Sequence, residues 1–171
     1  MKLNRLFINS LFLLVLYLLS RKGYYMKLFI KHFNELSKEE LYEIYKLRVS
    51  IFVVEQNCPY QEIDDADKFA YHIYLKDDEG IKAYARVLPQ GVVFDSVGIG
   101  RVIAVTRHIG LGTKIVKAAI DFAKDKLNAD LITIEAQVYA CSLYEKLGFI
   151  KTSEEFLEDG IPHVQMKLKL F

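Results

Sequence analysis

The chain has 171 residues, which is enough for one domain with a substantial core and too few for two. Its hydrophobic content of 52% and charged content of 26% are typical of a soluble globular protein and exclude a disordered chain. A net charge of +1 excludes the broad basic surface with which many proteins bind nucleic acid. The two cysteines, Cys58 and Cys141, form no C-x-x-C pair, which excludes zinc ribbons and disulfide scaffolds and favours a reducing, cytoplasmic location.

Residues 1–25 differ in composition from the rest, because residues 6–19 are almost all apolar and have basic residues on both sides. Three interpretations compete for this segment. A membrane-spanning anchor requires ~20 apolar residues, and this segment is shorter. A secretory signal requires small residues at its cleavage site, where this chain has Leu18-Leu19-Ser20. We favour the third, a true start at Met26, because every recognisable pattern follows that residue. The expected organisation is therefore an extension over residues 1–25 and one domain over residues 26–171.

The elements after Met26 begin with a short strand at residues 27–31. A capping box with Ser37 as N-cap and Glu40 three residues later predicts a helix over residues 37–53. An acidic loop runs from there to Asp67. Residues 70–76 and 81–88 then alternate around turn-forming residues, which predicts a hairpin. A further strand is expected at residues 98–105.

Apolar residues at helical spacing predict an amphipathic helix over Leu111–Leu127, and a short strand follows at residues 131–136. A second helix is expected at residues 139–147, ended by Gly148, and strands at residues 150–157 and 163–170 close the chain. The strand–helix–strand unit requires a parallel, right-handed crossover, whereas the hairpins add antiparallel strands. The sequence therefore predicts a mixed α/β domain with six or seven mostly antiparallel strands and flanking helices.

The pattern Arg107-x-x-Gly110-x-Gly112 lies between the predicted strand and the start of the Leu111–Leu127 helix. A helix N-terminus offers unpaired N–H groups and partial positive charge, which suit a phosphate, and Arg107 adds a charged donor. The spacing matches neither the G-x-G-x-x-G fingerprint of dinucleotide-binding folds nor a Walker A loop. A plain tight turn at the helix entry is the competing interpretation.

Residues 100–112 resemble motif A of the GNAT N-acetyltransferases, and residues 142–149 resemble motif B of the same superfamily. The resemblance extends over residues 26–170 and is closest to the ElaA-like subfamily. The residues that carry this narrower resemblance are Leu47-Arg48, residues 52–56, Cys58-Pro59-Tyr60, Glu62-x-Asp64-x-x-Asp67, Ala83-Tyr84-Ala85-Arg86, Ala136-Gln137 and Glu158-Asp159-Gly160-Ile161-Pro162-His163.

The resemblance implies transfer of an acetyl group from acetyl-CoA to an amine by direct attack, in a wedge where the strand after the crossover helix splays away. Tyr144 occupies the family's position for the acid that protonates the leaving thiolate, although a tyrosine packed in the core is the plainer alternative. A backbone N–H near Val105 is expected to stabilise the oxyanion. The expected acetyl-CoA-binding residues are Ile103, Ala104, Val105, Arg107, His108, Ile109, Gly110, Leu111, Gly112 and Thr113.

Glu62 is the expected base for the amine, with Glu55 and His163 as reserves. The acidic loop lies where acceptors enter this fold and is expected to attract a cationic amine, although such loops are often merely solvated. Glu55 has a plainer alternative too, an ion pair with Arg48. The expected acceptor-binding residues are Arg48, Phe52, Glu55, Tyr60, Asp64, Asp67, Arg86 and His163.

Two other functions stay open at this point. Acyl-homoserine-lactone synthases share the core and several of these charged residues, but the absence of tryptophan and the glycine loop favour the acetyltransferase. A non-catalytic CoA-binding module is the other possibility. We expect a small-molecule amine or a lysine as acceptor, no nucleic acid, no metal, a membrane contact only through residues 6–19, and a possible homodimer.

Overall fold

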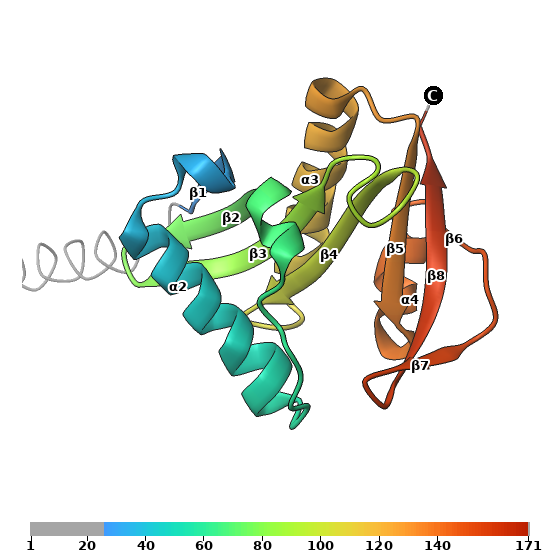
Figure 1. The fold of residues 1–171 in the computed structure, drawn as a ribbon, viewed down its shortest axis with the longest axis horizontal. Helices are drawn as coiled ribbons and strands as arrows, with labels where there is room; N and C mark the ends of the chain where they lie inside the picture. Colours follow the sequence, from blue (N-terminus) through green and yellow to red (C-terminus); the bar gives the residue numbers. More distant parts are fainter. Residues whose placement is uncertain (1–25, 171) are drawn as a thin grey trace, which may run out of the picture.

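The computed structural model describes residues 26–170, and the interpretations of residues 1–25 lie outside that range. One eight-stranded sheet runs through the domain in the order β1-β2-β3-β4-β5-β8-β6, with β7 paired to β8 (Figure 1). Among the strands of residues 26–170 only β4 and β5 pair in parallel, so the predicted mixed, mostly antiparallel sheet is confirmed. The strands are β1 (Lys27–His32), β2 (Tyr71–Asp77), β3 (Gly80–Leu88), β4 (Val97–Ala104), β5 (Leu131–Gln137), β6 (Ile150–Lys151), β7 (Phe156–Glu158) and β8 (Ile161–Lys169).

The helical elements cover both faces of this sheet. α2 (Lys38–Val49) packs on one face, whereas α3 (Leu111–Leu127) and α4 (Cys141–Glu145) belong to the other. Shorter turns are η1 (Phe33–Glu35), η3 (Asp65–Phe69) and η4 (Val138–Ala140). Among residues 26–170, no helix is both long and apolar enough to cross a membrane.

The α2 helix begins where its sequence predicts. The Glu40 N–H donates to Ser37 Oγ at 3.1 Å, and the Ser37 N–H donates to Glu40 Oε2 at 2.9 Å, which completes the capping box. The helix then widens into the π-helical segment η2 (Ser50–Glu55). The predicted helix over residues 37–53 is therefore present, but its last turns have a different hydrogen-bond pattern.

The predicted strand over residues 150–157 is wrong, because it divides into β6 and β7. Thr152 and Ser153 form hydrogen bonds with Gln165 of β8 in place of a continuous ladder; the Gln165 N–H donates to Ser153 Oγ at 2.8 Å. Such side-chain acceptors compete with regular strand pairing. This interruption explains why the sheet has eight strands and not six or seven.

The core has two parts, one on each face of the sheet. The larger part lies under α3 and α4 and includes Ile73, Ile115 and Ile132, all fully buried. The smaller part lies under α2 and includes Tyr74 and Tyr84. Because β2 and β3 are covered on both faces, consecutive residues in them are buried, which fixes these strands firmly against the helices.

The parallel pair β4 and β5 separates soon after it forms. Only Val97↔Ile132 and Gly98↔Thr133 are paired, so the β5-facing edge of β4 is not covered by β5 beyond Gly98. β4 also carries a bulge opposite β3, and Arg101 within it has a φ of 51°. The splayed wedge that the resemblance implied is therefore present.

Candidate active site

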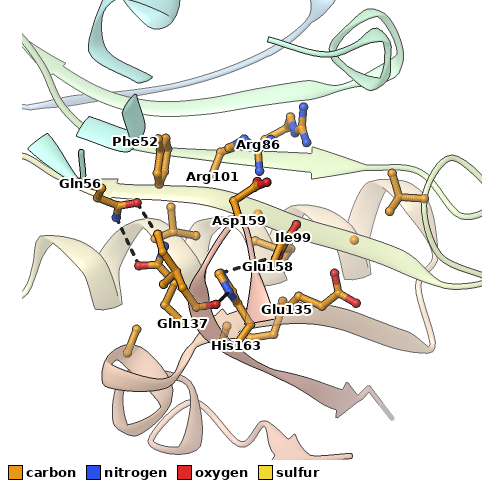
Figure 2. Close-up of a pocket in the computed structure, with 18 of the residues that line it drawn as sticks. Phe52, Gln56, Arg86, Ile99, Arg101, Glu135, Gln137, Glu158, Asp159 and His163 are labelled. Atoms are coloured by element: carbon orange, nitrogen blue, oxygen red, sulfur yellow. Dashed lines mark hydrogen bonds and ion pairs between the residues drawn. The ribbon is translucent and has the colours of Figure 1, made fainter. Parts of the chain in front are cut away.

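A cavity of about 280 Å³ opens in the wedge between β4 and β5. Figure 2 shows that its walls come from distant parts of the chain: β3, β4 and η2 on one side, and β5 with the β7–β8 turn on the other. Gln56 and Gln137 bridge the two sides through reciprocal amide hydrogen bonds of 3.3 and 3.2 Å. The lining residues used below are Phe52, Tyr60, Asp64, Arg86, Arg101, Glu135, Tyr144, Glu158, Asp159 and His163.

The residues of the loop between β4 and α3, from Val105 to Gly110, are exposed to solvent. Gly110, the N-cap residue of α3, has a φ of 84°, which an L-side chain disfavours. No side chain caps this helix end. The first N–H groups of α3 are thus oriented for an anionic ligand, as the phosphate interpretation of the loop requires.

The structure explains only one of the two glycines of the loop. A Cβ at Gly110 would meet no atom within 4 Å, so the conformation and not space explains this glycine. A Cβ at Gly112 would lie 3.5 Å from Leu143 Cδ2, an ordinary contact with α4. Packing on α4 therefore does not require a glycine at residue 112.

Arg107 and Glu55 form an exposed ion pair that joins the loop to η2. The alternative in which Glu55 pairs with Arg48 is wrong, because the Arg48 side chain is directed to other carboxylates. The pair holds Arg107 beside the α3 N-terminus and leaves the first N–H groups of that helix available to a ligand. An incoming phosphate can therefore replace Glu55 as the partner of Arg107.

Arg48 is the centre of a buried ion network behind the cavity. Its Nε donates to Glu62 Oε1 at 2.8 Å, and its two terminal nitrogens donate to the Asp67 carboxylate at 2.6 and 3.0 Å. Asp67 also accepts from Arg86 at 2.9 Å. Burial opposes ionisation of Asp67, but the two arginines outweigh it and hold the pKa of this carboxyl below its usual value.

Glu62 is 2% exposed and does not line the cavity. Its Oε1 accepts from Arg48 and, at 2.9 Å, from Arg101 Nε, while its Oε2 is buried with no partner in the described part of the chain. The base role of Glu62 stays a prediction, and these contacts favour a different task, which is to hold the two arginines in place.

Arg101 lies between two aromatic rings at the cavity wall. Its guanidinium carbon is 5.9 Å from the centroid of Phe52 and 5.6 Å from that of Tyr60. Burial raises the pKa of Tyr60 to about 12, so its phenol stays neutral. The predicted acceptor residues Phe52 and Tyr60 thus reach the cavity, with an arginine between them that the sequence did not single out.

Tyr144 also lines the cavity and is 8% exposed. Its ring packs edge-on against Phe149 with centroids 5.7 Å apart, so the plainer alternative of a core tyrosine describes its ring. Burial, reinforced by Tyr139 and Cys141, raises the pKa of its phenol above the usual value. Its hydroxyl makes no hydrogen bond with residues 26–170, and it is available to a ligand in the cavity.

The profile of the family described as acetyltransferase (GNAT) domain matches residues 34–170. A UPF0039 protein of Schizosaccharomyces pombe is 42% identical over 144 residues, covering 82% of this chain and 95% of that protein. The crystal structure of Escherichia coli ElaA has a TM-score of 0.78 at 34% identity, covering 83% of this chain and 98% of that one.

The chain belongs to the GNAT acetyltransferase family. An acyl-CoA N-acyltransferase from Pseudomonas aeruginosa has a TM-score of 0.77 at 35% identity, covering 83% of this chain and 98% of that chain. The resemblance to the ElaA-like subfamily is confirmed by these relatives. A CoA-dependent acyl-homoserine lactone synthase shares the fold with a TM-score of 0.70, but at 15% identity the likeness shows the fold alone.

The oxyanion donor expected near Val105 is not the Val105 N–H itself in this GNAT domain. The Val105 N–H donates to the Lys82 carbonyl at 2.9 Å, so it is occupied in the sheet. The bulge at Arg101 lines the cavity, and the extra residue of a bulge leaves the ladder. Nothing in the spacing of the sequence marked this bulge.

The wall formed by β5, β8 and the β7–β8 turn is acidic. Glu135, Glu158 and Asp159 line it, and among the described residues none of them pairs with a lysine or an arginine. Burial and the nearby Glu158 raise the pKa of the Glu135 carboxyl. His163 Nδ1 lies 2.8 Å from the Ile161 carbonyl and Nε2 lies 3.7 Å from Glu158.

The predicted residues of this GNAT site fall into three places. Phe52, Tyr60, Asp64, Arg86, Tyr144 and His163 line the cavity, whereas Arg48, Glu62 and Asp67 lie behind it. Glu55 lies at the loop with Arg107. Prediction from sequence did not commit to Arg101, Glu135 or Asp159, because the contacts that give them meaning join residues far apart in the chain. Within residues 26–170, no group of three or more potential metal ligands comes together.

Proposed function

We propose that this protein is an acetyl-CoA-dependent N-acetyltransferase that transfers the acetyl group to a primary amine by direct attack. One observation carries the proposal. The loop of residues 105–110 joins the uncapped N-terminus of α3 to β4, and the free edge of β4 borders the same cavity that Tyr144 lines. An extended ligand could therefore bind the N-terminus of α3 at one end, follow the free edge of β4, and reach the Tyr144 hydroxyl.

The residues present fit acetyl-CoA in its expected orientation. The N–H groups of Leu111, Gly112 and Thr113 would hold the diphosphate, helped by Arg107. The backbone of Ile103 and Ala104 would pair with the pantetheine arm, since β5 has already separated from β4 at this level. The coenzyme supplies an activated acetyl thioester.

Tyr144 is proposed to stabilise the leaving sulfur. A thiol has a pKa of ~8.5 and a phenol of ~10, so complete transfer of the phenol proton to the thiolate is uphill by about 2 kcal/mol or more. Burial raises the pKa of Tyr144 further. Tyr144 therefore acts mainly by donating a hydrogen bond while the C–S bond breaks. CoA leaves as a thiolate that takes up a proton from solvent, and the attacking amine gives its proton to a base.

Glu135 is proposed as the group that takes the amine proton. It lines the cavity, and its raised pKa makes it a stronger base than an ordinary carboxylate. Glu62, in contrast, already accepts two charged hydrogen bonds through one oxygen and lies outside the lining. We therefore assign Glu62 the role of positioning Arg101.

The proposal is tested by following thiol release from acetyl-CoA across a panel of primary amines, with titration calorimetry of CoA beside it. Thiol release that depends on an amine, together with CoA binding that protects the amides of residues 111–113 from exchange, is expected. No heat and no protection would contradict the proposal. Lactone formation from S-adenosylmethionine and an acyl-carrier protein, in place of amide formation, would contradict it as well.

A further inference from the structure

The two walls of the cavity carry opposite chemistry. Arg86 and Arg101 lie on the wall formed by β3 and β4, Glu135 and Glu158 lie on the other wall, and the Asp159 side chain extends from the β7–β8 turn toward the arginines in this view (Figure 2). Both arginines also contact buried carboxylates, so the question is which of their donors remain for a ligand. The hydrogen bonds of each guanidinium answer it.

Arg101 has one nitrogen without a partner. Its Nε donates to Glu62 Oε1 at 2.9 Å, and its Nη2 lies 3.4 Å from the Glu62 carbonyl and 3.5 Å from Asp64. Its Nη1 makes no hydrogen bond to any residue of the described range. The rings of Phe52 and Tyr60 flank the guanidinium, so this donor is held in a fixed direction at the cavity wall.

Arg86 leaves a whole edge unused although only 6% of its side chain is exposed. Its Nη1 donates to Asp64 at 2.7 Å and to Asp67 at 2.9 Å. Its Nε is buried with no partner, and its Nη2 makes no hydrogen bond within residues 26–170. Because Nε is closed off from solvent, Nη2 is the nitrogen of Arg86 that a ligand in the cavity can reach.

The network itself is balanced in charge, since Arg48, Arg86 and Arg101 face Glu62, Asp64 and Asp67. The unused donors therefore call for a ligand with acceptor atoms. Glu135, Glu158 and Asp159 are exposed and pair with no lysine or arginine of the described residues, so an ammonium group can approach them and be attracted by their charge. A polyamine would satisfy only the acidic wall, and a simple carboxylic acid only the arginines.

We infer that the acceptor is a small amino acid, a primary amine that also carries a carboxylate, bound with its carboxylate on Arg86 and Arg101 and its amine toward Glu135. The cavity of about 280 Å³ lies at the small end of ligand sites and suits a molecule of this size. This inference rests on the proposed acetyltransferase function and names the substrate class for that site.

Matched pairs of acceptors test the inference on the unaltered protein. Each pair is an amino acid and the amine left after its decarboxylation: lysine with cadaverine, ornithine with putrescine, alanine with ethylamine. Thiol release should show kcat/KM at least about tenfold higher for the amino acid of a pair, as expected for a lost charged hydrogen bond. Equal or better use of the decarboxylated amines would overturn the inference and leave the proposed function standing. No thiol release with any amine would overturn both.

Arg101→Lys supplies the second test, because lysine keeps the charge and loses the planar fork. KM for the amino acid should rise about tenfold, while KM for its decarboxylated partner and for acetyl-CoA stays unchanged. Lys124→Gln on the exposed side of α3 is the control and should change neither KM. An equal rise in KM for both members of a pair would overturn the inference. If Arg101→Lys fails to fold, the acceptor pairs still decide.

Discussion

Two groups of three carboxylates each in this protein have opposite surroundings. Glu62, Asp64 and Asp67 stand close together in sequence and are engaged by three arginines. Glu135, Glu158 and Asp159 come from separate elements and line the cavity without a lysine or arginine partner in the described part of the chain. The difference shows that the function of a carboxylate depends on its partners. A carboxylate that is already paired with buried arginines attracts a cationic ligand only weakly, whereas an unpaired one can bind it.

The largest effect on kcat is expected when Tyr144 is replaced, because its hydroxyl, like the carboxylates of the cavity wall, has no lysine or arginine partner among residues 26–170. Tyr144→Phe should lower kcat by roughly 10²–10³-fold, the range for removing one hydrogen-bond donor from a developing negative charge. CoA affinity by calorimetry should remain, since the loop is untouched. A variant with unchanged kcat would place Tyr144 among the merely structural residues, and retained binding without turnover in the parent would favour a non-catalytic CoA module.

The carboxylates paired with arginines, Glu62, Asp64 and Asp67, should instead affect the free energy of unfolding. Asp67→Ala leaves Arg48 and Arg86 short of a buried partner and should cost about 3–5 kcal/mol in the free energy of unfolding. Asp65→Ala is the matched control, because its side chain is 92% exposed and pairs only with Lys68. Urea unfolding of both variants checks this. Similar urea midpoints for Asp67→Ala and Asp65→Ala would contradict the stabilising role of the buried network.

The same network predicts a pH dependence. The folded-state pKa of Asp67 lies below its unfolded value, so its contribution to stability is complete above that value. The contribution should be lost as the pH falls through the folded-state pKa, below 3.8. Unfolding measured between pH 2 and 5 should show a shallower loss of stability in Asp67→Asn than in the parent. Parallel curves would contradict the assignment.

The loop glycines offer a smaller test. Gly110→Ala places an L-residue at a φ of 84° and should cost roughly 1–2 kcal/mol in stability. Gly112→Ala adds a methyl group at ordinary contact distance from Leu143 and should cost less. Thermal unfolding compares the two. A reversed order would show that packing, and not conformation, governs this helix entry.

The smallest effect is expected at Arg107. Its pair with Glu55 is exposed, and exposed ion pairs contribute about 0–1 kcal/mol, so Arg107→Ala should barely change stability. CoA affinity should fall a few-fold, and the difference from the parent should shrink as salt is added. Calorimetry at two salt concentrations measures both. Unchanged affinity at low salt would remove Arg107 from the coenzyme site.

Local signals made much of this fold predictable. The capping box of Ser37 and Glu40 located the start of α2, and the periodic apolar residues located α3 to the residue. The loop before α3 was predictable for the same reason, since glycine spacing and a helix start are local. The interruption at Thr152 and Ser153 was not, because it depends on hydrogen bonds to Gln165 on another strand.

The cavity was less predictable than the loop. Its charged residues acquire their roles through contacts across long stretches of sequence, such as Arg101 with Glu62 and Arg107 with Glu55. A sequence pattern shows that Glu62 is acidic but not that two arginines already occupy one of its oxygens. The bulge that turns Arg101 toward the cavity likewise becomes visible only in the register of β3 and β4.

The pH profile of kcat/KM for acetyl transfer, measured in the parent, Glu135→Gln and Glu62→Gln, tests the division between the two acidic groups most directly. Glu135 acts when ionised and its pKa is raised, so activity in the parent should rise with pH through a limb above pH 4.5. Glu135→Gln should lose that limb and most of its turnover while keeping its stability, and Glu62→Gln should lose stability and keep the limb. Full turnover in Glu135→Gln, with a lost limb in a stably folded Glu62→Gln, would contradict the account and return the role of base to Glu62.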